Sequence, residues 1–173
     1  MAEIDEAEAD GKLSEHVDFS EAQQFKYMQA VIKEAMRMHP VIAMPLERVV
    51  PEGGAIICGK FLPEGTIVGI NAWAMHYSKD IFGHDVDDFR PERWLEAGPD
   101  RLRLMEQSFL AFGHGSRTCI GKNISILEMS KFVPQVLRHF RLEWAAPKDE
   151  WSVVGLFGAK QSGLIMRVIP RKQ

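Results

Sequence analysis

The first part of the chain has the apolar spacing of one amphipathic helix. Ser20 and Gln23 have the spacing of a capping box, and Pro40 stops the pattern that follows. Four apolar residues recur between them at helical intervals: Phe25, Met28, Ile32 and Ala35. The sequence therefore predicts a helix over residues 20–39.

Short β-favouring runs separated by Pro- and Gly-containing turns come next. Three such runs occur within residues 40–71: Leu46–Val50, Ala55–Cys58 and Thr66–Ile70. They predict a small antiparallel sheet, followed by a short helix at Ala72–Tyr77. Residues 83–107 follow; their beginning is rich in Asp, Pro and Gly, and we expect an irregular surface loop there.

The last third of the chain combines a helix with strands. Residues 122–140 carry apolar side chains on more than one face, which predicts a buried helix kinked at Pro134. Residues 141–173 predict strands at Arg141–Trp144 and Leu164–Ile169 with a long turn between them. The fold class expected from these elements is mainly α with a small antiparallel sheet, α+β.

Composition and charge narrow the class of protein. The chain has 173 residues, 46% hydrophobic and 26% charged, with a formal net charge of -3. These values fit one folded domain and exclude a disordered tail or a basic nucleic-acid module. The two cysteines, Cys58 and Cys119, cannot form a disulfide framework and match no C-x-x-C metal pattern.

The N-terminal segment carries no chemistry in our interpretation. The charged residues within 1–19 are acidic except Lys12, which is typical of a solvated helix face or a frayed end. The acidic stretch Ala2–Asp10 is not a signal peptide, and the longest uncharged stretch near the middle, Gly65–Ser78, is too short to span a bilayer. We expect no anchor or signal in this chain.

Candidate chemistry concentrates in the cysteine loop, residues 112–121. Cys119 lies in a glycine-rich turn that opens directly into the predicted helix 122–140. Unpaired N–H groups and the helix dipole favour a thiolate there, so the cysteine could act as a metal ligand or a nucleophile. Glycines at 113, 115 and 121 leave one face uncovered, and a planar ligand could lie on it.

The residues of this loop resemble a known family. Phe112, Gly115, Arg117, Cys119 and Gly121 match the F-x-x-G-x-R-x-C-x-G signature of the cytochrome P450 superfamily, with the additional Gly113 that many members share. The resemblance implies that Cys119 is the axial thiolate ligand of heme iron. It also implies that Arg117 pairs with a heme propionate and that Phe112, Gly113 and Gly121 frame the cofactor. An inert cysteine in a glycine turn is the alternative.

Two further segments agree with the resemblance. Glu34 and Arg37 form an E-x-x-R pair, and Arg93 follows in a Pro-Glu-Arg segment. In the family these residues form a buried network, so we expect a structural triad in which each charge is paired. Arg48 would reach the second propionate, although an exposed strand arginine is the alternative.

The resemblance also suggests a substrate-contacting turn. Four consecutive residues after Pro40 would face the cavity above the heme: Val41, Ile42, Ala43 and Met44. Their apolar character implies an apolar organic substrate. His76 stands where relatives often have histidine or arginine, and we interpret it as a packing residue.

The family implies a heme-thiolate monooxygenase that uses O2 and receives NADPH electrons through a reductase. The chain is similar only to the C-terminal heme-binding portion of that fold, a truncated form over residues 1–173. It is most similar to the fungal microsomal branch that includes pisatin demethylase and benzoate para-hydroxylase. A full-length parent would be anchored to the endoplasmic reticulum by an N-terminal segment that we expect this chain to lack, together with the oxygen-activating helix.

Two alternatives stay open at this point. One is a truncated heme-binding or vestigial fragment without turnover. The other is a small α+β interaction protein whose cysteine loop is accidental.

Overall fold

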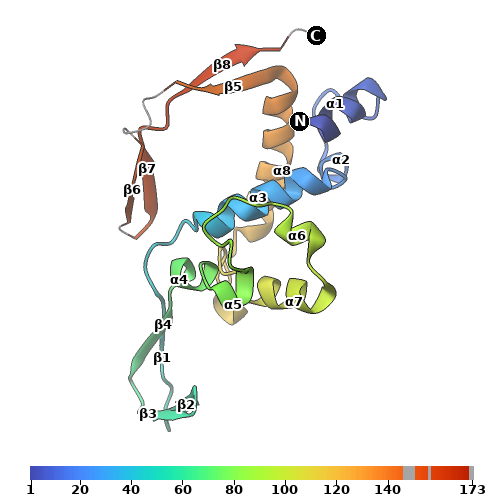
Figure 1. Cartoon of the computed structure of the whole chain (residues 1–173). Coiled ribbons are helices and arrows are strands. Elements are labelled where there is room, and N and C mark those ends of the chain that lie inside the picture. Colours follow the sequence, from blue (N-terminus) through green and yellow to red (C-terminus); the bar gives the residue numbers. More distant parts are fainter. Residues whose placement is uncertain (146–150, 156, 172–173) are drawn as a thin grey trace.

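The computed structural model describes residues 1–145, 151–155 and 157–171. Two longer helices, α3 (Lys26–Met38) and α8 (Lys122–His139), cross in the middle of the molecule. The shorter helices gather around them, and β-hairpins extend outward (Figure 1). The chain is therefore helical at its centre with small antiparallel sheets outside, the predicted fold class.

The predicted helix 20–39 is divided in two. A short helix, α2 (Phe19–Ala22), precedes α3, and residues 23–25 lie between them. The capping box is formed by Asp18 and Glu21 rather than by Ser20 and Gln23. The break allows Phe25, 4% exposed, to turn into a buried apolar cluster.

The acidic N-terminal segment is more ordered than a frayed end. Residues 2–9 form α1 (Ala2–Ala9), whose Ile4 is 2% exposed and belongs to the same cluster as Phe25. Both carboxylate oxygens of Glu3 accept hydrogen bonds from the backbone N–H groups of Tyr27 and Met28, at 3.0 and 3.1 Å. An acidic side chain of α1 thus satisfies donors in the first turn of α3.

Residues 40–71 form two antiparallel ladders. β1 (Leu46–Val49) pairs with β4 (Ile67–Ile70), and β2 (Ala55–Ile57) pairs with β3 (Lys60–Leu62). The strand β3 was not predicted. Its turn has φ of 50° at Cys58 and 75° at Gly59, two positive values in succession as a tight two-residue hairpin requires.

The expected loop over 83–107 is wrong in its second half. After α4 (Ala72–His76) and α5 (Lys79–Phe82), the chain forms α6 (Arg93–Glu96) and α7 (Pro99–Gln107). Pro99 starts α7 at a position where its missing N–H is not needed. The helix then buries Met105, 1% exposed, in a second cluster with Trp94 and Phe82.

The helix α8 is not buried as predicted. It continues past Pro134, and only Ser130 and Pro134 are buried along its length. Apolar side chains such as Ile124 and Phe132 are 64% and 69% exposed. The sequence shows that both faces are apolar, but it does not show which face the described residues cover.

The C-terminal strands include a hairpin that the sequence did not predict. β5 (Phe140–Trp144) pairs with β8 (Met166–Pro170), close to the two predicted strands. The expected long turn contains β6 (Ser152–Gly155) paired with β7 (Ala159–Ser162). Among the described residues, no helix combines the length and hydrophobicity needed to cross a membrane.

Candidate functional site

The cysteine loop is held by its own backbone. The N–H of Cys119 donates to the carbonyl of Phe112 at 2.8 Å, which closes the loop. A 3-10 turn at Gly115–Arg117 lies inside it, and Gly113 and Gly115 have φ of 71° and 69°. These left-handed conformations favour glycine, so the glycines allow the tight path of the loop.

The thiol of Cys119 stands free at the start of a helix. Cys119 is exposed and forms no disulfide, and α8 begins three residues later at Lys122. The first-turn N–H groups of a helix stabilise nearby negative charge. The residue is exposed and precedes the N-terminus of a helix, so its sulfur is accessible to a ligand.

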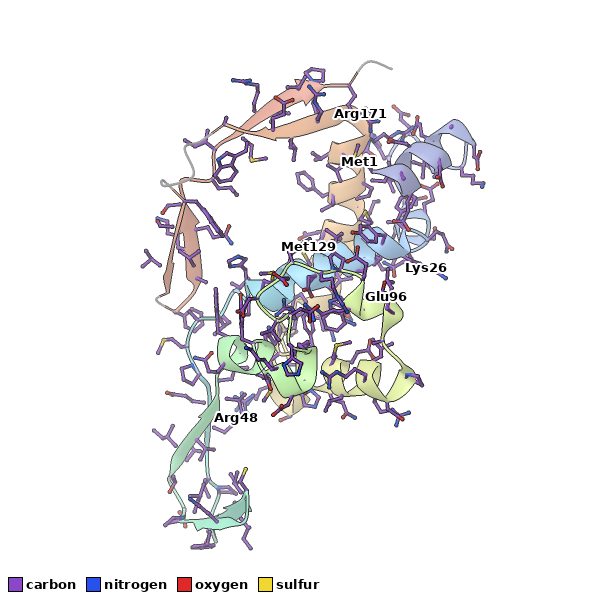
Figure 2. The ribbon with its side chains drawn as sticks, in the orientation of Figure 1. Met1, Lys26, Arg48, Glu96, Met129 and Arg171 are labelled. Atoms are coloured by element: carbon purple, nitrogen blue, oxygen red, sulfur yellow. The ribbon has the colours of Figure 1, made fainter. Side chains whose placement is uncertain are left out.

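The two predicted propionate arginines line one pocket. This pocket has a volume of about 640 Å³ and lies between the β1–β4 ladder and the cysteine loop, with Arg48 and Arg117 in its wall. Both side chains are exposed, and the Arg48 Nη1 donates to the carbonyl of its neighbour Glu47 at 2.6 Å. Figure 2 shows Arg48 on the β1–β4 arm, below the central helices.

Phe112 and Gly113 face a different space. They line a pocket of about 740 Å³ between α3, α8 and the loop, together with residues such as Lys33 and Lys122. Gly121 is the N-cap of α8, and a Cβ there would lie 3.8 Å from the Cys119 sulfur. The structure thus divides the predicted cofactor residues between the two sides of the loop.

The predicted triad is brought together in the interior. Glu34 and Arg37 are 0% exposed and Arg93 is 2% exposed. The Arg37 guanidinium donates to both Glu34 oxygens at 2.9 and 3.0 Å, and the Arg93 Nε donates to Glu34 Oε1 at 2.9 Å. One carboxylate therefore pairs with two guanidinium groups out of water.

The carboxylate of Glu34 has further partners that the sequence did not predict. The Trp94 Nε1 donates to Glu34 Oε2 at 2.9 Å, and the backbone N–H of Arg90 donates to Glu34 Oε1 at 3.2 Å. Burial raises the pKa of Glu34, but hydrogen bonds from Arg37 and Arg93 outweigh it and hold the pKa below its usual value. The proximity of Trp94 to Arg93 in the sequence was the available signal.

The second positive charge of the network has its own acidic partner. The Arg93 Nη1 donates to Asp85 Oδ1 at 3.0 Å, and its Nη2 donates to the Asp85 carbonyl at 2.8 Å. The Arg37 Nη1 donates to the carbonyl of His76 at 3.0 Å. We call this set of buried groups around Glu34, Arg37 and Arg93 the charge network.

The apolar turn after Pro40 meets the C-terminal hairpin. The N–H of Ala43 donates to the Phe157 carbonyl at 3.1 Å, and Ile42 forms a β-bridge with Gly158. Val41 and Met44 remain 68% and 47% exposed. Val41 and Met44 thus present exposed apolar surface next to the β6–β7 hairpin, whereas Ile42 and Ala43, which meet the hairpin, are half-buried.

His76 has more partners than a packing residue needs. It is 0% exposed and stacks on Phe109, with ring centroids 5.2 Å apart. Both ring nitrogens also form hydrogen bonds, to Arg37 and Leu110. Sequence reasoning missed these bonds, because partners 39 and 34 residues away give no local signal.

The residues present fit a heme. The cofactor implied by the loop motif has a flat ring, an iron that takes an axial ligand, and two carboxylates. An accessible thiol, a glycine without a side chain next to its sulfur at position 121, and two arginines in one pocket match these three features. The arginines supply planar donors suited to carboxylates.

Comparison with known proteins points to the same family. The family model described as cytochrome P450 matches residues 1–165. Pisatin demethylase of Fusarium vanettenii is 55% identical over 127 residues, covering 73% of this chain and 24% of that protein. Cytochrome P450 monooxygenases of Aspergillus terreus and Emericella nidulans are 48% and 43% identical, covering 80% and 98% of this chain.

The chain spans only part of these relatives, 28% of the Aspergillus terreus protein and 34% of the Emericella nidulans protein. The alignments nevertheless include most of the chain, and the family model extends across both the charge network and the cysteine loop. The chain belongs to the cytochrome P450 family.

Proposed function

We propose that residues 1–173 are the C-terminal heme-binding portion of a heme-thiolate monooxygenase, with Cys119 as the axial ligand. The observation that carries this proposal is the accessible Cys119 thiol in a glycine loop beside a pocket lined by Arg48 and Arg117. A thiol at a helix start supplies the anionic ligand, and two guanidinium groups supply the countercharge for two carboxylates.

Bound heme supplies dioxygen activation and the transfer of one oxygen atom to an organic substrate. The protein residues hold the cofactor and the substrate in place. Cys119 provides a thiolate, and Arg117 and Arg48 bind the propionates. Gly113 and Gly121 place no side chain on the loop or on the start of α8, and Phe112 lines the pocket between α3, α8 and the loop.

The substrate side is the partly exposed apolar surface of Val41–Met44 beside the β6–β7 hairpin. Its apolar side chains suit an apolar organic molecule. The name of one relative states that it demethylates pisatin, which supports an organic small-molecule substrate. In the full-length parent, electrons come from NADPH through a reductase, and the site of action is the endoplasmic reticulum membrane.

The charge network acts as scaffold in this proposal. Glu34, Arg37 and Arg93 are too deeply buried to meet a substrate, and their hydrogen bonds join α3 to the segment from Asp85 to Trp94. Pairing makes such buried charges tolerable, and removal of one partner leaves the others unpaired.

A second candidate function is heme binding without turnover. The apolar side chains that α8 leaves exposed, among them Ile124 and Phe132, favour it, because the described residues provide no wall over them. The two candidates differ in one result: product formation from an apolar substrate with NADPH, O2 and a reductase supports turnover, and its absence in a heme-loaded chain supports binding alone.

The heme proposal is tested by the reduced carbon-monoxide difference spectrum of the chain loaded with hemin. We expect a strongly red-shifted Soret band that Cys119→Ser abolishes. Cys58→Ser is the matched control, since Cys58 is also exposed but lies on the β2–β3 turn. The same spectrum for Cys119→Ser and the unchanged chain would reject Cys119 as ligand.

A further inference from the structure

His76 connects the charge network to the segment before the cysteine loop by hydrogen bonds on both sides of its ring. It lies on α4, between the charge network on α3 and Leu110, the residue two positions before the cysteine loop. Phe82 meets the ring edge-on at 5.9 Å, and Phe109 stacks on it. Aromatic side chains therefore pack against the ring in two directions.

The hydrogen bonds of the ring fix one protonation state. The backbone N–H of Leu110 can only donate, and it lies 2.7 Å from His76 Nε2, so this nitrogen must be the acceptor. The Arg37 carbonyl can only accept, and it lies 2.9 Å from Nδ1, so this nitrogen must carry the proton. The neutral Nδ1–H form is the one state that satisfies both partners.

Two hydrogen bonds join His76 to Arg37 on α3. Arg37 receives the Nδ1–H bond at its carbonyl, and its Nη1 donates to the His76 carbonyl at 3.0 Å. The same guanidinium binds both oxygens of Glu34. The position of His76 is thus coupled directly to the charge network.

From Leu110, backbone hydrogen bonds lead on to Cys119. The carbonyl of Leu110 accepts from Gly113 N–H at 2.9 Å, and the carbonyl of Phe112 accepts from Cys119 N–H at 2.8 Å. Leu110 is 7% exposed, so a loss of its N–H partner would not be compensated by water. A shift of Leu110 therefore moves the turn that contains Phe112, to which the Cys119 backbone is hydrogen-bonded.

We propose that His76 is a positioning residue of the cysteine loop, whose neutral ring ties the charge network at Arg37 to Leu110 and so fixes where the Cys119 thiol stands. The role of that thiol as a ligand rests on the proposed function. The hydrogen bonds from Arg37 through His76 to Leu110, which we call the relay, are present in the protein without cofactor. Burial also lowers the pKa of His76 to about 4, in agreement with a neutral ring.

The test compares His76→Phe with His76→Gln. Phenylalanine keeps a ring for stacking on Phe109 but leaves Leu110 N–H and the Arg37 carbonyl without partners, whereas a glutamine oxygen can accept from Leu110. We measure amide exchange at Leu110, Gly113 and Cys119, with the β5 amides as reference. His76→Phe should accelerate loop exchange at least about tenfold relative to β5, and His76→Gln should restore it to within about threefold.

Equal acceleration in the loop and in β5 would overturn the proposal, as would a glutamine variant that behaves like the phenylalanine variant. If His76→Phe does not fold, nitrogen NMR of the unchanged chain decides. The proposal requires Nδ1–H and an unprotonated Nε2 at neutral pH, and a protonated Nε2 contradicts it.

These measurements separate the proposal from the heme assignment. With hemin bound, His76→Phe should lose more of the red-shifted carbon-monoxide band than His76→Gln. A chain that shows the exchange pattern but binds no hemin refutes the proposed function and supports the relay. A chain that binds hemin through Cys119 with unchanged loop exchange in His76→Phe supports the function and refutes the relay.

Discussion

The charge network and the cysteine loop are built in opposite ways. Glu34 is 0% exposed and accepts five hydrogen bonds from side chains and backbone. Cys119 is exposed, and its loop is closed by backbone hydrogen bonds. In the charge network the polar groups are hydrogen-bonded to one another, so they are not available for reaction. In the cysteine loop the Cys119 thiol has no hydrogen-bond partner among the described residues. The residues that stabilise the fold are therefore different from the residue that can bind a ligand.

The largest expected effect is a loss of stability when the charge network is altered. Glu34→Gln removes the negative charge between two buried guanidinium groups, so we expect a loss of about 3–5 kcal/mol in the free energy of unfolding, measured by urea denaturation. Asp100→Asn is the matched control, because Asp100 and Arg103 form an ion pair with the same i,i+3 spacing but with side chains 96% and 69% exposed.

The control should change stability by less than about 1 kcal/mol. Similar losses in both variants would mean that burial does not decide the strength of the charge network. If neither variant lost stability, the charge of Glu34 would not be needed in the charge network.

The next effect is a pH dependence of the connection between the regions. The folded protein holds the pKa of His76 at about 4, below the ordinary value of 6.5. Between these values the unfolded chain binds a proton that the folded chain does not, so stability falls as the pH falls through this window. The loss reaches on the order of 3 kcal/mol at pH 4.

Unfolding free energies measured at a series of pH values test this prediction. In His76→Gln the decline between pH 6.5 and about 4.5 should become much smaller, and the part that remains is expected from His39, whose pKa burial also lowers. The decline at lower pH should persist, because Glu34 also has a lowered pKa and loses its ion pairs when it is protonated. An unchanged slope in His76→Gln would show that another group titrates.

A smaller effect concerns the acidic segment, to which the sequence assigned no chemistry. Glu3→Ala removes the acceptor for two N–H groups of α3, so we expect a loss of about 1 kcal/mol. Glu6→Ala, in the same helix α1, is the control and should change stability by less than about 0.5 kcal/mol. Thermal or urea unfolding measures both, and equal effects would contradict the capping role.

The smallest effect on stability is expected on the exposed face of α8. Phe132 is 69% exposed, so Phe132→Ser should change the free energy of unfolding by less than about 0.5 kcal/mol. It should reduce self-association in sedimentation velocity, because it removes apolar surface beside a hollow of about 630 Å³. Phe61→Ser, on the distant strand β3, should leave self-association unchanged. A stability loss above about 1 kcal/mol would contradict the exposure of Phe132.

The two regions also differ in how far the sequence predicts them. The loop is local in sequence, so its tight turn and the helix after Gly121 follow from glycine positions and periodicity, although its closing hydrogen bond from Cys119 to Phe112 was not predicted. Long-range partners are not encoded locally. Trp94 reaches Glu34 across 60 residues, and Leu110 reaches His76 across 34.

Element boundaries were missed where tertiary burial outweighs local signals. Phe25 fits a continuous helix by spacing but is needed in the buried cluster, so the helix breaks before Lys26. Residues 83–98 resemble a loop by their Asp, Pro and Gly content, and the expected loop was extended from there over α7, where Met105 anchors a helix. The exposure of α8 could not be predicted, since an apolar pattern indicates what can be buried and not what covers it.

The most direct test of the central claim is iron K-edge X-ray absorption of the hemin-loaded chain. If Cys119 is the axial ligand, a sulfur atom appears in the first coordination shell of the iron in the unchanged chain and in Cys58→Ser, and it is absent in Cys119→Ser. A shell without sulfur in the unchanged chain, or one that retains sulfur in Cys119→Ser, would contradict the assignment of this loop as the heme-ligand site.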